Sequence, residues 1–436
     1  MATEAAGTEQ RGKAFEGSLA DFARPQGPNL LERTQPYHEW VEARREAGVW
    51  PFMRRLGSPP GPRASVVTPD GEHAEFLNFG TQDYLGLTSH PAVRAAAAEA
   101  VDAFGPHSAG SSALLGNSTR SAELAERLAG LVGMEHLQLF PTGWAAGFGT
   151  IVGLVRPYDY VVMDKLAHAC LQAGAFAATP RVTRYDHVDV ESARAQLAEI
   201  RSADSHGGIL VITEGLFSLD SDCLQIGELQ TVCREFEATL LVDLAHDLGS
   251  LGPGGTGQLG VQGLLGEVDL VMGSFSKTFA SNGGFVAAHT PSVVEFAFAF
   301  SNSGTFSNGL SPIQASVVLK AVEIVTSEEG EGLRADLLRV VTAARSRFAE
   351  EGIECLGDPS ALIPVPVGND AAARYASKLV RERGVLANLF EFPGVEVGSA
   401  RFRMQAMARH TVEQAVEAAT IVAGAIRDAR EEVESA

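Results

Sequence analysis

The chain has 436 residues, of which 45% are hydrophobic and 20% charged, a balance typical of a folded globular protein. Asp and Glu outnumber Lys and Arg by 54 to 34, and the resulting net charge of −20 disfavours binding to nucleic acids or anionic membranes. The four cysteines form no CxxC pair and no run of 18 apolar residues occurs, so we expect no disulfide scaffold, no metal site and no membrane span. The amino-terminal segment lacks the apolar core of a secretory signal, and we expect a cytoplasmic protein.

The first 75 residues are expected to form an arm and a linker. Residues 1–35 are rich in Gly, Gln, Pro and charged side chains, which is typical of a loose segment. A short helix is predicted next, closed by Gly48. Residues 51–72 are rich in Pro and Gly and are predicted to be a linker or an extended crossing segment.

From about residue 76, short apolar runs alternate with Ala-rich helical stretches, which predicts an α/β fold with a mostly parallel sheet and helices on both faces. The predicted strands are His136–Phe140, Tyr160–Met163, Gly208–Thr213, Thr239–Asp243, Leu270–Gly273 and Gly284–His289. The predicted helices are Ala92–Ala103, Ser121–Leu131, Val190–Ile200, Ile226–Phe236, Pro312–Ser327 and Gly332–Glu350. We expect residues 76–315 to form a large domain and residues 316–436 a smaller α+β lobe, whose last helix begins near Thr411.

Common nucleotide and hydrolase motifs are not supported. Two overlapping GxGxxG matches lie between Gly252 and Gly260, but no strand runs directly into them and Pro253 interrupts the first, so a glycine-rich loop is the preferred interpretation. The sequence contains no GxxxxGK[ST] phosphate loop and no GxSxG nucleophile motif.

Three features stand at the ends of predicted strands, where an open α/β sheet places its site. One strand delivers Asp243 at its carboxyl end, with His246 three residues later. A buried carboxylate in this position can keep a pyridinium nitrogen protonated, although an Asp at a strand end is more often a simple cap.

A second strand ends at Ser276-Lys277-Thr278. Most lysines are solvated surface charges, but this one directly follows a buried strand, which is the rigid and partly desolvated place that a Schiff-base lysine needs. A third strand breaks at Pro141-Thr142-Gly143 and a helix follows. The backbone N–H groups of Gly143 and Trp144 would face an anion there, while Trp144 by itself is more simply a packing residue.

Taken in order along the chain, these segments resemble the α-oxoamine synthases, which are pyridoxal-phosphate enzymes of the aspartate-aminotransferase fold (fold type I). The resemblance runs from about Leu77 to His410. It rests on Asp83-Tyr-Leu-Gly-Leu87, Asp164-x-x-x-His168, Glu214-Gly-Leu-Phe-Ser218, Asp243-x-x-His246, Ser276-Lys277, Phe306-Ser-Asn308 and Ala400-Arg-Phe-Arg403-Met-Gln.

The resemblance implies a role for each matching residue. It implies that Lys277 binds the cofactor covalently and moves the substrate proton, that Asp243 pairs with the pyridine nitrogen, and that His246 contacts the phenolic oxygen near Ser218. It implies that His168 stacks on the ring and polarises a thioester carbonyl. The phosphate would be held by Gly143, Trp144 and Ser274, and by Ser307 of a neighbouring subunit, so the resemblance implies a homodimer with composite sites.

Arg403 is the expected clamp for the amino acid carboxylate, because a guanidinium can bind a carboxylate through two hydrogen bonds. Arg401 would share its face on a strand, and the resemblance alone selects Arg403. Gln82 stands where many members of the family have a substrate-binding Asn. Leu244 and Ser221 also depart from the family pattern, and these differences leave the amino acid open.

The implied reaction is a decarboxylative Claisen condensation: a small amino acid (glycine, alanine or serine) joins an acyl thioester, and carbon dioxide and the thiol leave. The donor is a CoA or a carrier-protein thioester, and the charge of −20 slightly disfavours an acidic carrier. Two alternatives are another enzyme of the same fold, such as an aminotransferase, and a non-catalytic subunit. The presence of Lys277 and His246 argues against the second.

Overall fold

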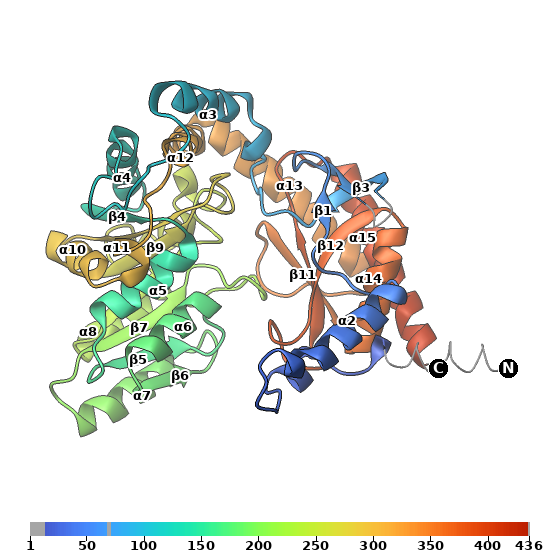
Figure 1. The fold of residues 1–436 in the computed structure, drawn as a ribbon, viewed down its shortest axis with the longest axis horizontal. Helices are drawn as coiled ribbons and strands as arrows, with labels where there is room; N and C mark the ends of the chain where they lie inside the picture. Colours follow the sequence, from blue (N-terminus) through green and yellow to red (C-terminus); the bar gives the residue numbers. More distant parts are fainter. Residues whose placement is uncertain (1–13, 68–70, 435–436) are drawn as a thin grey trace. The chain divides into compact units, whose positions relative to one another are not determined.

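The computed structural model describes residues 14–67 and 71–434. The chain forms two compact units, one comprising Gln82–Asp336 and the other the two chain ends, up to Thr81 and from Leu337. Each unit is built on its own β-sheet (Figure 1).

The larger unit contains a seven-stranded sheet in the order β4-β10-β9-β8-β7-β5-β6. Strand β10 runs antiparallel to β4 and β9, and the other pairs are parallel, so the predicted mostly parallel sheet is confirmed. The six predicted strands are confirmed to within one residue at each end, and β6 was not predicted. The strands are β4 (His136–Phe140), β5 (Tyr160–Asp164), β6 (Val182–Tyr185), β7 (Ile209–Glu214), β8 (Thr239–Asp243), β9 (Leu270–Ser274) and β10 (Gly284–Ala288).

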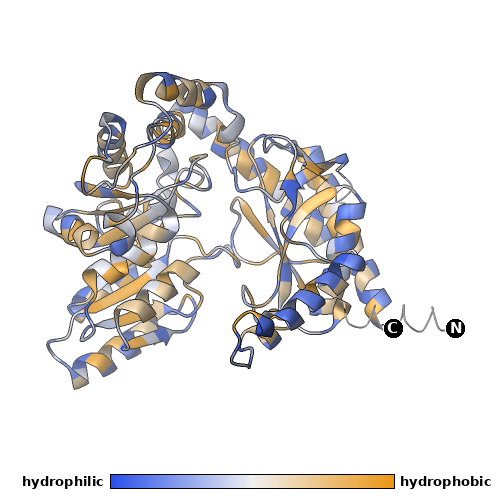
Figure 2. Cartoon of the chain, viewed as in Figure 1, coloured by the Kyte–Doolittle hydropathy of each residue, from blue (hydrophilic) through white to orange (hydrophobic). Residues whose placement is uncertain are grey.

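Both faces of this sheet are covered. All six residues of β7 and all five of β9 are buried, and successive side chains of a strand point to opposite faces. Apolar colours accordingly run along the central strands in Figure 2. The predicted helices are confirmed with end shifts of a few residues. The helices of this unit are α3 (Pro91–Phe104), α4 (Thr119–Leu131), α5 (Gly143–Leu154), α6 (Ala169–Ala178), α7 (Val190–Ala203), α8 (Ile226–Glu235), α9 (Gly257–Val261), α10 (Pro291–Ala299), α11 (Asn302–Thr305) and α12 (Pro312–Val325), and α13 (Glu328–Glu350) begins in it.

The smaller unit is an α+β lobe with a six-stranded sheet in the order β1-β2-β3-β12-β13-β11. Strands β3 and β12 are parallel, and the remaining pairs are antiparallel. The elements are α2 (Gln35–Glu46), β1 (Arg55–Leu56), β2 (Arg63–Val67), β3 (His73–Phe79), β11 (Leu362–Gly368), α14 (Asp370–Glu382), β12 (Val385–Phe390), β13 (Ala400–Gln405) and α15 (Val412–Glu434).

Two expectations for the amino-terminal region need correction. The segment predicted as a linker contributes β1 and β2 to the sheet, because its prolines and glycines bound the strands rather than interrupt them. The described part of the expected loose arm is held in place: Arg374 donates to the carbonyl oxygens of Phe15 and Gly17, and the Trp40 indole donates to that of Glu16. Residues 1–13 lie outside the described residues.

Within residues 14–67 and 71–434, none of the helices combines the length and the apolar character that crossing a membrane requires.

Close helix packing at Gly153 gives a first prediction. A Cβ added to Gly153 on α5 would collide with the backbone carbonyl of Ala297 on α10, so Gly153→Ala must push the two helices apart. We expect a loss of about 1–3 kcal/mol in unfolding free energy, measured by urea denaturation. The control is Gly130→Ala on α4, where a Cβ meets nothing within 4 Å and a gain of about 0.5–1 kcal/mol is expected. Equal effects of the two substitutions would contradict this account.

Candidate active site

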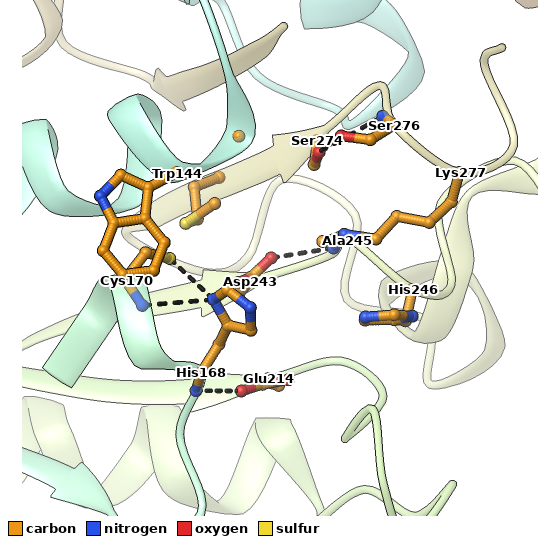
Figure 3. Close-up of a pocket in the computed structure, with 12 residues that line it drawn as sticks. Trp144, His168, Cys170, Glu214, Asp243, Ala245, His246, Ser274, Ser276 and Lys277 are labelled. Atoms are coloured by element: carbon orange, nitrogen blue, oxygen red, sulfur yellow. Dashed lines mark hydrogen bonds between the residues drawn. The ribbon is translucent and has the colours of Figure 1, made fainter. Parts of the chain in front are cut away.

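Neighbouring parallel strands of the larger unit end at the same edge of the sheet. Strand β7 ends at Glu214 and β8 at Asp243, which are paired in register, and Asp243 is in turn level with Met272 near the end of β9. A pocket lies at this edge (Figure 3). It is lined by Gly143, Trp144, His168, Cys170, Glu214, Asp243, Ala245, His246, Met272, Ser274, Ser276 and Lys277.

Two carboxyl groups are buried side by side in the pocket wall. Burial raises the pKa of Glu214 well above its usual range, and the neighbouring charge of Asp243 adds to this effect. Burial also raises the pKa of Asp243, but the positive charge of the nearby Lys277 opposes the shift. Asp243 accepts a hydrogen bond from the amide of Ala245 at 2.8 Å. Asp243 is therefore the more readily ionised of the two carboxyl groups, and its negative charge favours a positively charged partner in the pocket.

The amino end of α5 forms a cradle for an anion. The Thr142 hydroxyl caps the helix by accepting from the amide of Ala145 at 3.0 Å, and the first two residues of the helix, Gly143 and Trp144, line the pocket. A Cβ at Gly143 would collide with the Ser274 hydroxyl, so glycine lets the strand end and the helix end approach closely. The hydroxyl oxygens of Ser274 and Ser276 lie 2.8 Å apart and supply further donors.

Lys277 follows β9 directly, and its side chain extends toward the side of the pocket that holds Asp243 and Ala245 (Figure 3). His246, on the same wall, shares a hydrogen bond of 2.9 Å between its Nδ1 and the hydroxyl of the buried Tyr84. Tyr84 belongs to the Asp83–Leu87 motif, but its contact with His246 spans 162 residues and could not be read from the sequence.

His168 stands opposite, at the start of α6. Its backbone N–H donates to the Glu214 carboxyl at 2.6 Å, and its ring lies edge-on to that of Trp144 with 6.2 Å between centroids. Trp144 is half exposed, so it is not the plain core residue that was the simpler interpretation. Sequence reasoning gave no role to Glu214 or Cys170, which also line the pocket.

This donor set fits pyridoxal 5′-phosphate. The amine of Lys277 can bind the aldehyde of this cofactor. A helix amino end and two hydroxyl groups can hold its phosphate, and the buried carboxylate can pair with its ring nitrogen. Because Gly143 has no Cβ, a phosphate could approach the helix amino end closely there.

The structure gathers most of the expected site residues in this pocket: Gly143, Trp144, His168, Asp243, His246, Ser274 and Lys277. The other expected residues of the larger unit are Gln82, Ser218 and Ser307, which are half-buried and do not belong to its lining. Arg403 lies on β13 of the smaller unit, buried, with its guanidinium 4.4 Å from the ring centre of Phe390.

A partly buried histidine outside the pocket, His187, connects the loops that carry His168 and Ser218. His187 Nδ1 lies 2.9 Å from the Asp164 carboxylate, and Nε2 lies 3.2 Å from that of Asp222. Burial opposes a charge on this ring, but the hydrogen bonds to Asp164 and Asp222 outweigh it and raise the pKa of His187 to about 10. Because both ring nitrogens face acceptors, His187 is an imidazolium that links the ends of β5 and β6 to the loop after β7.

Comparisons with known proteins agree with this geometry. A family model described as aminotransferase class I and II matches residues 74–422. Serine palmitoyltransferase of Sphingobacterium spiritivorum is 32% identical over 87% of this chain and 92% of its own length, and 8-amino-7-oxononanoate synthase of Geotalea daltonii is 32% identical over 88% and 96%.

A third relative is longer than this chain. The 4-hydroxy-2,2′-bipyrrole-5-methanol synthase PigH of a Serratia species is 31% identical over 94% of this chain, which spans 62% of that protein's length. Among solved structures, Sphingomonas wittichii serine palmitoyltransferase has a TM-score of 0.85 at 26% identity, covering 92% of this chain and 99% of that one. A structure of SPT with PLP internal aldimine gives the same TM-score and identity, covering 92% and 100%.

The charged state of His187 gives a second prediction. A histidine whose pKa rises from 6.5 in the unfolded chain to about 10 in the folded one stabilises the fold fully below pH 6.5, and this contribution is lost as the pH rises through about 10. We expect His187→Gln to lower the unfolding free energy by roughly 2–4 kcal/mol near pH 6, and the deficit to shrink as the pH rises from 6.5 toward about 10.

Denaturation of both proteins across this pH range measures the effect. The control is His289→Gln, which changes a ring that is 41% exposed beside Glu135 and should cost less than about 1 kcal/mol. A deficit that grows with pH would contradict the assignment of charge to His187.

Proposed function

Because the chain belongs to the aminotransferase class I and II family and, within it, to the α-oxoamine synthases, we propose that it condenses a small amino acid with an acyl thioester. A bond forms between the amino acid Cα and the acyl carbon, and the thiol and the amino acid carboxyl group, as carbon dioxide, leave. A proton returns to Cα and the product is an α-aminoketone. The observation that carries this proposal is a lysine and a buried carboxylate in one pocket beside a helix amino end.

Pyridoxal 5′-phosphate is the cofactor, and when bound it supplies an electron sink for a carbanion at Cα. Lys277 is assigned as its attachment point and as the group that removes and returns the Cα proton. Asp243 is assigned to the ring nitrogen, because an anion buried beside that nitrogen keeps it protonated. The phosphate is assigned to Gly143, Trp144 and Ser274.

The remaining assignments concern orientation. His246 and Ser218 are assigned to the phenolic oxygen, and the contact from Tyr84 holds the His246 ring in place. His168 is assigned to the ring face and to the thioester carbonyl. Arg403 is assigned to the amino acid carboxylate, and Gln82 is assigned to holding the amino acid substrate. Glycine, alanine and serine remain candidate substrates, as do CoA and carrier-protein donors.

We further propose a homodimer in which Ser307 reaches the neighbouring subunit's phosphate. Three exposed apolar side chains surround this residue in sequence and space: Leu114 and Leu115 are 80% and 92% exposed, and Phe306 is 83% exposed. Their two segments are joined, because Ser111 pairs with Asn308 and its hydroxyl donates to the Thr305 carbonyl. A second copy covering them would remove this apolar surface from water. We expect the dimer to act in the cytoplasm, where its four free cysteines stay reduced.

A third prediction tests the reaction. Wild-type enzyme incubated with small amino acids and a series of acyl-CoAs should release thiol and carbon dioxide, and the product mass should identify both substrates. Lys277→Ala should abolish turnover and the covalent label that borohydride places at this position. Asp243→Asn should retain the label but lower kcat on the order of 100-fold or more, because the neutral amide no longer stabilises the ring charge.

A matched control is Asp269→Asn, which changes a carboxylate that holds the amides at the start of β8 away from the pocket. Production of an oxoacid without thiol release would contradict the synthase assignment and show that the protein is an aminotransferase.

A fourth prediction tests the assembly. Phe306→Asp and Leu115→Asp should convert the dimer to a monomer of 46.0 kDa in sedimentation velocity, with loss of activity because each site lacks its neighbour's Ser307. Val261→Asp, at a position 54% exposed elsewhere on the larger unit, should leave the dimer intact. A wild-type enzyme that is fully active as a monomer would rule out composite sites.

A further inference from the structure

Two atoms of Cys170 lie within hydrogen-bonding distance of the same ring nitrogen of His168. The backbone N–H of Cys170 points at Nδ1 with 3.3 Å between the heavy atoms, and the Cys170 sulfur lies 3.0 Å from the same Nδ1 (Figure 3). A backbone N–H can only donate, so the nitrogen that accepts from it must present a lone pair. In a neutral imidazole the proton then resides on the other nitrogen, Nε2.

The Cys170 thiol acts in the same direction. The side chain is buried, and burial, reinforced by the negative charges of Asp243 and Glu214, raises the pKa of the Cys170 thiol far above its usual value. The sulfur therefore keeps its proton, and an S–H facing a lone pair is a weak donor. A thiolate would instead attract a proton to Nδ1.

Contacts with neighbouring groups hold the His168 ring in this position. His168 is the N-cap of α6, and Cys170 is the second residue of that helix, so the contact is set by the start of the helix. The backbone N–H of His168 is fixed by Glu214 at the end of β7, and the Trp144 ring stands edge-on to the imidazole. Both Cys170 and His168 line the pocket.

We infer that Cys170 is a positioning residue, which holds His168 as a neutral imidazole with its proton on Nε2, and that His168 acts as a hydrogen-bond donor to the acyl thioester carbonyl rather than as a base. The inference about the carbonyl rests on the proposed function, whereas the tautomer does not. A donor at this oxygen stabilises the negative charge that develops when the amino acid carbon attacks. Proton transfer at Cα is then left to Lys277.

The tautomer is measured directly. In holoenzyme labelled with ¹⁵N-histidine, the ring nitrogen resonances of His168, assigned by their disappearance in His168→Gln, should show a protonated Nε2 and an unprotonated Nδ1 at neutral pH. A protonated Nδ1 would overturn the inference, whatever the activity of the enzyme.

The role of the thiol is measured with Cys170→Ala, Cys170→Ser and the control Cys233→Ala. Cys233 on α8 is also a buried thiol with a raised pKa, but it does not line the pocket. We expect Cys170→Ala to lower kcat/KM for the acyl thioester roughly threefold to tenfold, the worth of one hydrogen bond, and Cys170→Ser to restore most of it through its O–H donor. Cys233→Ala should leave kcat/KM unchanged.

Each outcome has one meaning. A Cys170→Ala enzyme that matches the Cys233→Ala control, or a serine variant that restores nothing, would remove the thiol from the inference. If Cys170→Ala does not fold, the nitrogen resonances of the wild type decide. If the wild type releases no thiol from any acyl donor but shows the predicted tautomer, then the proposed function fails and the statement about His168 stands.

Discussion

The burial of two carboxyl groups side by side, Glu214 and Asp243, is the constraint on which the rest of the site depends. The parallel register of β7 and β8 pairs them directly, and both are almost inaccessible to water. Removing an ionised carboxylate from water costs several kcal/mol unless a positive partner compensates it. In this site Glu214 accepts a hydrogen bond from the backbone amide of His168, and the neighbouring Asp243 carboxyl group favours a cationic partner. Under the proposed function the pyridinium ring of the cofactor would be that cation, which would explain why a carboxylate is tolerated there.

Parallel pairing also explains how residues separated by more than 100 positions meet. Strands β5, β7, β8 and β9 enter the sheet in the same direction, so the loops that follow them open on one edge. Each loop contributes one kind of chemistry: His168 follows β5, Glu214 ends β7, and Lys277 follows β9. The antiparallel β10 fits the same edge, because it begins at Gly284, level with Ser274 and with Phe140 before the α5 cradle.

The central strands could be predicted because they are buried on both faces and therefore appear as continuous apolar runs bounded by turn residues. Both ends of strand β8 were predicted correctly. Strand β6 lies at the sheet edge with a mixture of buried and exposed residues, and its sequence carries no such run. Strands β1 and β2 were obscured by the prolines and glycines around them.

Membership of the pocket was predictable where it follows from a residue's own motif, as for Asp243 and Lys277, which both line it. A contact was not predictable where it depends on a partner that the fold supplies. Tyr84 meets His246 across 162 residues, and Asp164 and Asp222 meet at His187 from different loops. Ser221 shows an intermediate case: it stands where the family pattern has glycine, and its φ of 59° is the left-handed conformation that glycine adopts without strain. The sequence shows that Ser221 replaces the usual glycine, and the positive φ at this position explains why the family pattern has glycine there.

The histidines near this sheet edge show that protonation is decided by neighbours more than by residue type. Both nitrogens of His187 face carboxylates, so the ring is a cation that holds loops together. Nδ1 of His168 faces a backbone amide and a thiol, so that nitrogen carries no proton and the ring stays neutral. Nδ1 of His246 faces a tyrosine hydroxyl, which can either donate or accept. One residue type thus provides a fixed charge, a fixed donor and an adaptable contact, and the difference lies in which atoms the fold places beside each ring.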